Sequence, residues 1–376
     1  MVLTKYKIGE LIEQVAEKNS DMLYGENDVY GMTITKELIP TKANVSSTDL
    51  SKFLVVGPNE FVYNPRTHGK HIGLGYNNST NSFLISWNNT AFRVKKSAMD
   101  KILPEYLFLH FNRTEWDREA CVNSWGSSTE VFSWDSLCGM ELELPAVCIQ
   151  KKYVDVYEAM LANQKYYEFG VEDLKRTCEI MIDRIKHDAP RVRVDNLLEN
   201  VDERNTDGTI SSVNGININK EFMLSLAKVD GNGLKRYKLV RPGQFAYSGM
   251  QTGRDECIRI TLNQTELSKI VSPAYSVLGV KSNDVMPEYI MQWFSRSESD
   301  RYGWFASDAS VRANLDLDRF LEIEIPLPDK RIQKSIADIY KVYKERQHIN
   351  ERLKLQLKDI CPVLIKGSRE EAEKGE

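Results

Sequence analysis

The residues whose types could support metal binding or redox chemistry are few, and their spacing argues against both. His68 and His71 lie three residues apart, but a metal pair needs further ligands, and the chain has only five histidines. We therefore expect a solvated loop here, or a loop that touches a ligand. The six cysteines are scattered without a C-x-x-C pair, which indicates reduced thiols rather than a disulfide framework or a zinc module.

Two other segments come close to catalytic motifs, but each lacks an essential part. Ile72–Gly75 is a lone G-x-G without the third glycine, so a turn at a strand edge is the better interpretation. Ser272–Tyr275 is close to the S/N/D-P-P-Y/F motif of amino-methyltransferases, but it lacks the second proline and no cofactor-binding glycine motif precedes it. There is no P-loop, G-x-S-x-G elbow or H-E-x-x-H motif. We therefore predict that this chain is not an enzyme on its own.

The composition is typical of a globular protein with more than one domain. The 376 residues are 41% hydrophobic and 28% charged, and no apolar run approaches the roughly 18 residues of a membrane span. The first residues lack the apolar core of a signal peptide, so we expect a cytoplasmic protein without membrane contact. The net charge is −4, so any nucleic-acid binding must use basic side chains focused on one face.

The chain repeats itself at a spacing near 183 residues, which predicts its domain organisation. Ile149–Tyr157 and Ile332–Tyr340 are identical at five of nine positions. Other blocks match in the same order: Glu141–Pro145 with Glu322–Pro326, Pro104–Tyr106 with Pro287–Tyr289, Gly57–Tyr63 with Arg241–Tyr247, and Lys7–Val15 with Arg193–Val201. We therefore predict two diverged copies of one architecture.

Each copy begins with a strand-rich part, which a long helix follows. Short β-branched and aromatic runs alternate with Gly, Asn and Pro turns, and Pro104 and Pro287 suit the first turn of short helices. A heptad pattern then continues through residues 153–185 and 332–364. The predicted seam comprises Tyr157, Met160, Tyr167, Val171, Leu174, Cys178 and Met181 in the first helix, and Ile336, Ile339, Tyr343, Leu353, Leu357, Ile360 and Leu364 in the second.

Polar residues in the middle of both seams suggest that the helices pair with each other. Gln164 interrupts the first seam, and Arg346 and Asn350 interrupt the second, where such residues would fix the register. Gly170 is a weak point that costs about 1 kcal/mol relative to Ala. We expect an antiparallel pair, a rod of roughly 52 Å with the globular parts at its ends. The alternative is two separate amphipathic helices, each packed on its own domain.

Taken together, these patterns resemble the DNA-specificity (S) subunit of type I restriction-modification systems. Ile323–Ile360 is similar to the conserved region of the family, whose usual form is I-P-x-P-x-x-E-Q-x-x-I, and Leu142–Met160 is a more divergent copy. Phe61–Pro65 and Phe245–Gly249 resemble the F-x-Y-N/S strand of the family's target recognition domains. The likeness covers the full length, and its specificity comes from the duplicated architecture.

The resemblance implies an α+β fold with two globular strand-rich target recognition domains, related by the internal repeat and separated by two long antiparallel coiled-coil helices. We expect the first recognition domain at 1–148, a conserved helix at 149–190, the second recognition domain at 191–328, a second conserved helix at 329–368 and a charged tail at 369–376.

The resemblance also implies a function and a set of partners. Each recognition domain would read one half of a bipartite, asymmetric target in double-stranded DNA. The helices would set the spacing and dock two methyltransferase (M) subunits, partly through Tyr166, Phe169 and Leu355 beside the seam. Two restriction/translocase (R) subunits would complete the complex. The partners, not this chain, would use S-adenosylmethionine, ATP and Mg2+. The alternatives are a two-domain coiled-coil interaction scaffold without DNA binding and an enzyme with a cryptic active site.

Base and phosphate contacts are expected from matched loops after the F-x-Y strands and before the last strand of each domain. Arg can read guanine there and Asn or Gln adenine, and the two loops differ in sequence, as two different half-sites require. Ordinary solvated turns are the simpler alternative. The candidates are Tyr63, Asn64, Arg66, Thr67, His68, Lys70, His71, Ser127, Ser128 and Thr129 in the first domain, and Tyr247, Ser248, Gln251, Thr252, Arg254, Ser307, Ser310 and Arg312 in the second.

Overall fold

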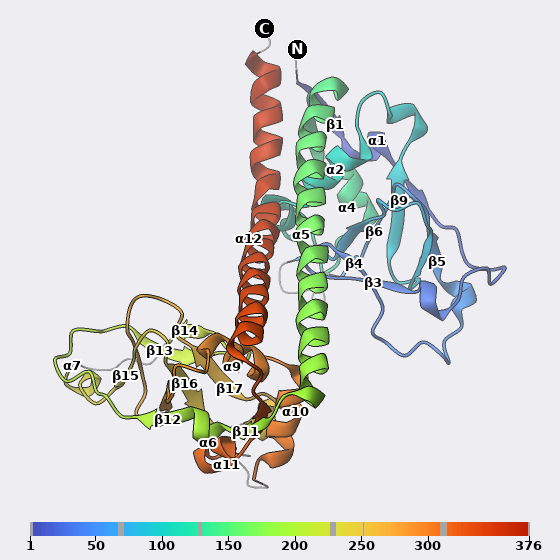
Figure 1. The fold of residues 1–376 in the computed structure, drawn as a ribbon. Helices are drawn as coiled ribbons and strands as arrows, with labels where there is room; N and C mark the ends of the chain where they lie inside the picture. Colours follow the sequence, from blue (N-terminus) through green and yellow to red (C-terminus); the bar gives the residue numbers. More distant parts are fainter. Residues whose placement is uncertain are drawn as a thin grey trace. The chain divides into compact units, whose positions relative to one another are not determined.

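The computed structural model describes residues 3–66, 71–126, 130–225, 231–250, 252–308 and 314–374. It consists of two compact units, which are described separately (Figure 1). Unit 1 comprises Met1–Tyr166 and Asn350–Glu376, and unit 2 comprises Tyr167–Ile349. Each unit contains one strand-rich domain together with part of the helix α5 (Val147–Asp188) and part of the helix α12 (Lys330–Lys374).

The strand-rich domains contain the same elements in nearly the same order. In unit 1 they are β1 (Thr4–Lys7), α1 (Ile8–Leu11), β2 (Ile12–Val15), η1 (Glu26–Asp28), β3 (Tyr30–Met32), β4 (Leu38–Pro40), η2 (Leu50–Lys52), β5 (Leu54–Val56), β6 (Glu60–Tyr63), β7 (Leu74–Tyr76), β8 (Phe83–Ile85), β9 (Thr90–Val94), η3 (Lys96–Ala98), α2 (Pro104–Phe111), α3 (Thr114–Val122), α4 (Trp134–Gly139) and β10 (Glu141–Leu144). In unit 2 they are β11 (Arg191–Arg193), α6 (Val194–Leu197), β12 (Leu198–Val201), β13 (Val213–Ile216), β14 (Phe222–Leu224), α7 (Gly231–Leu234), β15 (Lys238–Val240), β16 (Phe245–Ser248), α8 (Thr252–Asp255), β17 (Arg259–Leu262), β18 (Lys269–Val271), β19 (Ser276–Val280), α9 (Pro287–Phe294), α10 (Ser297–Ala306), α11 (Leu317–Leu321) and β20 (Glu324–Pro326).

The sheet topology confirms the internal repeat. The four-stranded sheet β2-β9-β6-β7 of unit 1 has its counterpart in β12-β19-β16-β17 of unit 2, and the ribbon β1-β10 has its counterpart in β11-β20. A second sheet, β14-β13-β18-β15, occurs in unit 2, and the described part of unit 1 has the pairs β3-β4 and β5-β8 at the matching places, with a parallel bridge between Val29 and Leu84. The α+β class predicted from the sequence is correct.

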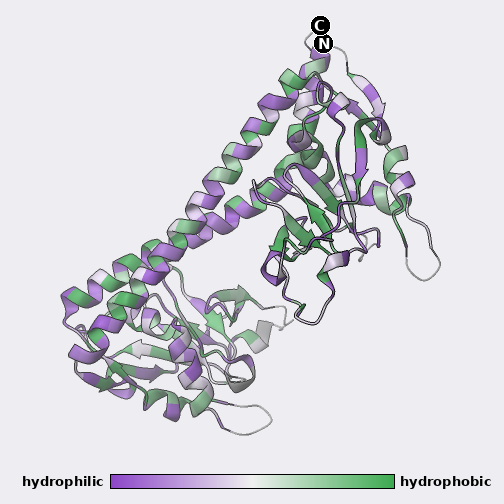
Figure 2. Cartoon of the chain, turned by 90° about the vertical axis from the view of Figure 1, so that its right-hand side faces the viewer, coloured by the Kyte–Doolittle hydropathy of each residue, from purple (hydrophilic) through white to green (hydrophobic). Residues whose placement is uncertain are grey.

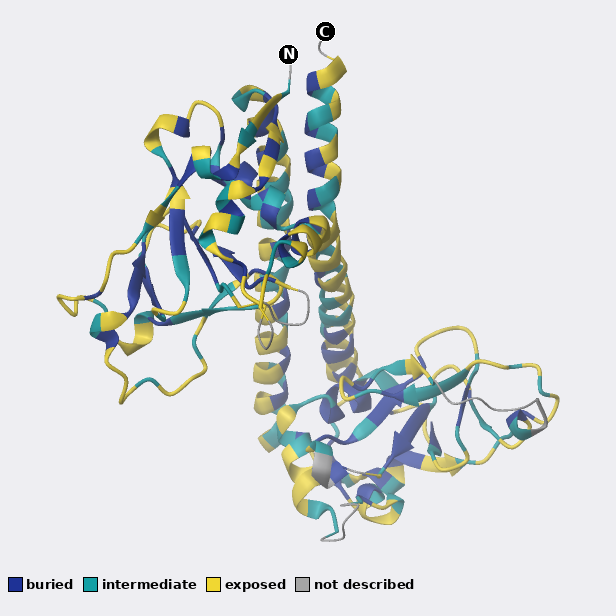
Figure 3. Cartoon of the chain, turned by 180° about the vertical axis from the view of Figure 1, so that it is seen from behind, coloured by how far each residue is buried: buried dark blue, intermediate teal, exposed yellow. Residues whose placement is uncertain are grey.

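Each unit has a core of buried aromatic side chains between its main sheet and its helices. In unit 1 the rings of Phe61 and Phe92 lie 5.0 Å apart, and those of Phe111 and Trp116 lie 4.8 Å apart. In unit 2 the rings of Tyr247 and Phe320 stack at 4.3 Å. The strands are mostly hydrophobic, while the long helices alternate hydrophobic and hydrophilic residues (Figure 2), and the strands are largely buried (Figure 3).

One buried glutamine explains the most similar block of the two copies. The Gln150 side chain accepts a hydrogen bond from the Leu103 N–H at 3.0 Å and donates to the carbonyls of Lys101 and Pro145 at 2.7 and 2.8 Å. Gln333 makes the equivalent bonds in unit 2: it accepts from Met286 N–H at 2.9 Å and donates to the carbonyls of Asp284 and Pro328 at 3.0 and 2.9 Å. Each amide thus fastens the start of a long helix to the loop before the Pro-Glu-Tyr helix.

Within each unit the segments of α5 and α12 run antiparallel. In unit 1 Lys152 pairs with Glu371, while Gln164 donates a buried hydrogen bond of 3.0 Å to Asn350 Oδ1. As the α5 number rises, the α12 number falls, which defines the direction of pairing. The polar pair predicted to fix the register is therefore in contact, and the alternative of two separate amphipathic helices is wrong.

The seam of unit 2 has an aromatic contact in place of an amide pair. The Arg346 guanidinium lies 5.9 Å from the ring centroid of Tyr167. A Cβ at Gly170 would come within 2.9 Å of Arg346 Nη1, so the glycine leaves room for the end of this long side chain. All predicted seam residues in both helices are buried or half-buried.

Residues 369–374 continue helix α12 instead of forming the separate charged tail expected from the sequence. Arg369 pairs with Glu143, and Ala372 is buried. The preceding turns close the core of unit 1: Leu364 and Ile365 belong to its main cluster of buried residues. The helix continues through Pro362, where a missing N–H and ring contacts would cost about 3 kcal/mol in isolation, so packing on unit 1 must offset this cost.

Candidate nucleic-acid interface

Two of the predicted DNA contacts are core residues. Tyr63 ends strand β6 and is 1% exposed; Tyr247 lies in β16 and is 2% exposed. The Tyr247 hydroxyl donates to the Leu315 carbonyl at 2.6 Å. Burial raises the pKa of Tyr63 to about 12, which keeps its hydroxyl neutral. Neither ring has a surface that a base could reach, so the prediction for both tyrosines is corrected.

Ser248 and Thr252 in the second loop are also buried, which corrects the same prediction for them. The Thr252 hydroxyl donates to the Gly249 carbonyl at 3.0 Å. The Leu315 N–H also donates to the Gly249 carbonyl, at 2.9 Å. A Cβ at Gly249 would lie 1.7 Å from the Leu315 carbonyl oxygen, so only glycine permits this approach. These residues join the two loop segments of unit 2 to each other.

Much of the predicted reading surface lies outside the described residues. This applies to the predicted contacts at Thr67, His68, Lys70, Ser127, Ser128, Thr129, Gln251, Ser310 and Arg312, and to the side chain of Arg254. Those at the loop edges are described: Asn64 is half-buried, whereas Arg66 and His71 are exposed. Asn64 Oδ1 accepts from the Arg66 N–H at 3.0 Å, which shapes the turn that leads into the loop.

The edges of the two predicted loops in unit 1 lie side by side. Val131 forms antiparallel bridges with both Arg66 and Trp125, and the Phe132 N–H donates to the Pro65 carbonyl at 2.7 Å. In unit 2 the Asp308 N–H donates to the Asn314 carbonyl at 2.9 Å, next to the Leu315–Gly249 bond. The described flanks of both loop pairs are therefore adjacent, as a shared reading surface requires.

A buried ion pair, absent from our sequence-based predictions, supports the same region in both units. Lys36 Nζ lies 2.8 Å from Asp117 Oδ2, and Lys220 Nζ lies 2.6 Å from Asp300 Oδ1. Both lysines have positive φ, 63° and 61°, in the tight connections between β3 and β4 and between β13 and β14. Each pair fastens a hairpin to the helix, α3 or α10, that leads into the second loop.

The two buried lysines lie in a short sequence block that recurs in both copies. Gly31–Glu37 reads G-M-T-I-T-K-E and Gly215–Glu221 reads G-I-N-I-N-K-E, so Gly, Ile, Lys and Glu recur in the same order. A lysine in a polar turn is normally solvated, which is why the block does not predict burial. In the structure Lys36 is 6% exposed and Lys220 is 7% exposed.

The electrostatics of the first pair differ from those of the second. Burial lowers the pKa of Lys36, although Asp117 opposes this effect. Asp117 Oδ2 also lies 3.5 Å from His71 Nδ1 at the loop edge, while no described residue donates a hydrogen bond to Asp117 Oδ1. Asp300 additionally accepts from the Ile258 N–H at 2.9 Å. His71 thus connects the exposed edge of the loop with the buried ion pair.

Large apolar side chains are exposed beside both loop pairs, and sequence reasoning missed these too. Val122, the last residue of helix α3, is 77% exposed, and Trp125 three residues later is 76% exposed. Phe305 near the end of α10 is 82% exposed. Sequence patterns assign such residues to cores by default, so only the structure could identify them as a surface feature.

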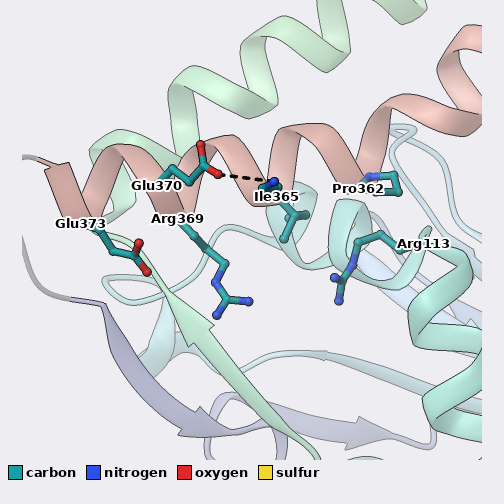
Figure 4. Close-up of a pocket in the computed structure, with 7 residues that line it drawn as sticks. Arg113, Pro362, Ile365, Arg369, Glu370 and Glu373 are labelled. Atoms are coloured by element: carbon teal, nitrogen blue, oxygen red, sulfur yellow. Dashed lines mark ion pairs between the residues drawn. The ribbon is translucent and has the colours of Figure 1, made fainter.

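We searched the described residues for metal clusters, pockets and membrane-spanning helices. No cluster of three His, Cys, Asp or Glu side chains among them could hold a metal ion. A pocket of unit 1 lies between Arg113 and helix α12 (Figure 4). Two of its basic side chains form ion pairs: Lys366 pairs with Glu370 at 3.6 Å, and Arg369 pairs with Glu143. None of the helices in the described ranges is both long and apolar enough to cross a membrane.

Comparison with known proteins identifies one domain and one fold. Residues 244–359 match the family model of the type I restriction modification DNA specificity domain, Methylase_S. A search of curated proteins found no match. The S subunit of the type I restriction-modification system from M. genitalium is similar in structure, with a TM-score of 0.62 at 12% identity, over 97% of this chain and 96% of that chain.

Two further solved structures align over nearly the full length with lower TM-scores. The HsdS subunit from Thermoanaerobacter tengcongensis has 13% identity and a TM-score of 0.34, over 99% of this chain and 96% of that chain. A chain from a study of complex assembly and conformational transition of the type I R-M system has 13% identity and a TM-score of 0.41, over 98% of both chains. The fold comparison therefore rests on the M. genitalium subunit.

Proposed function

We propose that this chain, whose residues 244–359 match the family model of the type I restriction modification DNA specificity domain and whose fold is similar to that of an S subunit, supplies DNA sequence specificity to a type I restriction-modification complex. The family model that matches describes a DNA specificity domain, which supports a role in target recognition. In this proposal each strand-rich domain reads one half of a bipartite, asymmetric target in double-stranded DNA.

The observation that carries the proposal is that the two units share buried contacts but differ in the exposed side chains beside their loops. Both units keep the buried glutamine at the start of the long helix, and both keep the Lys–Asp pair, which fastens a hairpin to the helix that leads into the second loop. At the exposed edges the side chains differ: Arg66 and Trp125 in unit 1, Phe305 in unit 2. Two domains that present different side chains on one scaffold are suited to reading two different half-sites.

The long helices are proposed to bind the partners and to set the half-site spacing. Tyr166, Phe169 and Leu355 lie beside the seam and are 69%, 71% and 62% exposed, which supports a docking role for two methyltransferase subunits. Two restriction subunits would join this assembly in the cytoplasm. S-adenosylmethionine, ATP and Mg2+ would serve the partner subunits.

The test is methylome sequencing of a host that carries the complete system, with wild-type S subunit or with Arg66→Ala. We expect a bipartite adenine-methylated target with wild type, and relaxed recognition at one base pair of one half-site with Arg66→Ala. Loss of one bidentate base contact costs about 1–3 kcal/mol, or roughly 5- to 150-fold in discrimination. Assembly with the methyltransferase should be unchanged, because Arg66 is exposed and lies outside both long helices.

The matched control is Arg118→Ala, since this exposed arginine of the same unit pairs only locally with Glu115 on helix α3. It should leave the target unchanged. If the wild-type system methylates no defined target while the chain still assembles with other proteins, the alternative of an interaction scaffold without DNA binding is favoured. If Arg66→Ala leaves the methylated target and rate unchanged, the reading surface lies elsewhere.

A further inference from the structure

The exposed apolar side chains beside the loops occupy a defined place in each unit. Helices α3 and α10 align through Asp117 and Asp300, which places Val122 opposite Phe305 and Trp125 opposite Asp308. Both helices therefore end in a large exposed apolar residue, and unit 1 adds a tryptophan three residues later. Trp125 is 76% exposed and Phe305 is 82% exposed.

The helices beside these side chains, α3 and α10, are anchored to their units by buried contacts. The opposite face of α3 is buried through Trp116, which is 0% exposed, and Asp117, which Lys36 holds at 2.8 Å. Helix α10 is held in the same way by Asp300, which Lys220 contacts at 2.6 Å and to which the Ile258 N–H donates at 2.9 Å. A firmly anchored helix that presents an aromatic ring to solvent suits an intermolecular contact, because its backbone does not need to be ordered on binding.

The neighbours of the rings point to the partner. Trp125 and Arg66 both form bridges with Val131, so all three side chains project from the same face of this small ribbon. All three are exposed on that face, which combines a positive charge with an aromatic surface. In unit 2 Phe305 lies three residues before Asp308, whose N–H donates to the Asn314 carbonyl beside the second loop.

We propose that Trp125 and Phe305 stack on, or insert between, DNA bases, one ring at each half-site. This inference rests on the proposed DNA-specificity function. A protein partner that bound both places as two identical copies would select the same residue at each, yet the counterpart of Trp125 is an aspartate and that of Phe305 is a valine. The two half-sites differ, and base stacking tolerates different rings, so DNA is the partner that fits this divergence.

The experiment measures binding of the complex with methyltransferase subunits to a duplex that carries the target found by methylome sequencing. Trp125→Ala should weaken binding roughly 5- to 150-fold, and Trp125→Phe should recover most of the loss. The dependence of binding on salt should stay as in wild type, because the indole carries no charge.

The matched control is Trp87→Ala. Trp87 is 57% exposed in the same unit but packs edge-on against Phe53 at 5.8 Å between their ring centroids, with no bridge to the loop edges. This variant should bind DNA like wild type. Phe305→Ala should weaken binding by a similar factor, and replacing one half-site with random sequence should abolish the effect of one ring variant and leave that of the other.

Three outcomes are distinguishable. If the wild-type complex binds no specific duplex, the proposed function fails, and with it the premise of this inference. If wild type binds specifically and both ring variants bind equally well, the inference is overturned. It is also overturned if the ring variants fail to assemble with the methyltransferase, since the rings would then face protein. Unchanged thermal unfolding of the variants excludes a folding defect, because both side chains are already in solvent.

Discussion

The buried pair of Lys36 and Asp117 should show strong energetic coupling, measurable in a double-mutant cycle. The two side chains are 4% and 7% exposed, and their charged atoms lie 2.8 Å apart. Removing one partner of a buried pair typically costs about 3–5 kcal/mol, because the other charge stays buried without compensation. Lys36→Met leaves Asp117 with the exposed His71 at 3.5 Å and with Oδ1 still lacking a described donor, so we expect the same range here.

The double variant Lys36→Met/Asp117→Leu should recover most of this loss. With both charges gone, the apolar side chains face the buried ring of Trp116, which lies 5.5 Å from Lys36 Nζ. Replacement of a buried ion pair by apolar residues is often neutral or stabilising. The free energy of unfolding of the four proteins, from urea denaturation at pH 7, should therefore give a coupling energy of about 3 kcal/mol or more.

The control cycle uses Arg118 and Glu115 on the same helix, whose side chains are 74% and 50% exposed and lie 3.3 Å apart. Coupling there should stay below about 0.5 kcal/mol.

The pH dependence of the stability is a second check on the buried pair. Burial lowers the pKa of Lys36 in the folded protein below its ordinary 10.5. Between the lowered pKa and 10.5, the unfolded chain therefore binds more protons at this residue than the folded chain does. Wild type should therefore gain stability relative to Lys36→Met over that interval. A coupling below about 1 kcal/mol at pH 7, or the opposite pH trend, would refute the reasoning.

Two further predictions concern the long helices. The double variant Gln164→Leu/Asn350→Leu removes the buried amide pair of the seam. It should keep or raise the free energy of unfolding while it permits other helix registers or self-association. Sedimentation of the isolated chain checks this, and a monomer with unchanged helix pairing would contradict it. Deleting one heptad from α5 and one from α12 removes about 10 Å from each helix. The gap between the half-sites should therefore shorten by about three base pairs, while the same bases are read. Methylome sequencing checks this, and an unchanged gap would show that the helices do not set the spacing.

The framework of the fold was readable from the sequence because its signals are periodic and duplicated. The seam residues follow a heptad repeat, and Gln164 and Asn350 interrupt it at the places where the structure pairs them. The recurrence of Gln150 as Gln333 marked a shared structural role, although its three hydrogen bonds depend on backbone groups that no local pattern reveals.

The candidate site was harder to predict, because burial there runs against residue type. Tyr63 ends its strand and Tyr247 is the last residue but one of its strand, both next to polar turns, which suggests exposure, yet both faces of these strands are covered. Lys36 and Lys220 are buried although lysines in turns are usually solvated, and Trp125 is exposed although tryptophan usually packs inside. Each of these depends on what the rest of the chain places over that position.

The closure of unit 1 by residues 361–365 has a consequence for synthesis. Unit 2 is one continuous stretch of chain, whereas the core of unit 1 includes Cys361, Leu364 and Ile365, which the ribosome adds roughly 200 residues after Tyr166. At about 5–20 residues per second this delay lasts roughly 10–40 s. During that time the unit made first keeps an open apolar flank around Tyr106 and Tyr153, while the unit made second can already complete its core. We therefore expect unit 2 to complete its folding before unit 1, although it is made later, and we expect the nascent first domain to expose this apolar flank until helix α12 has been made.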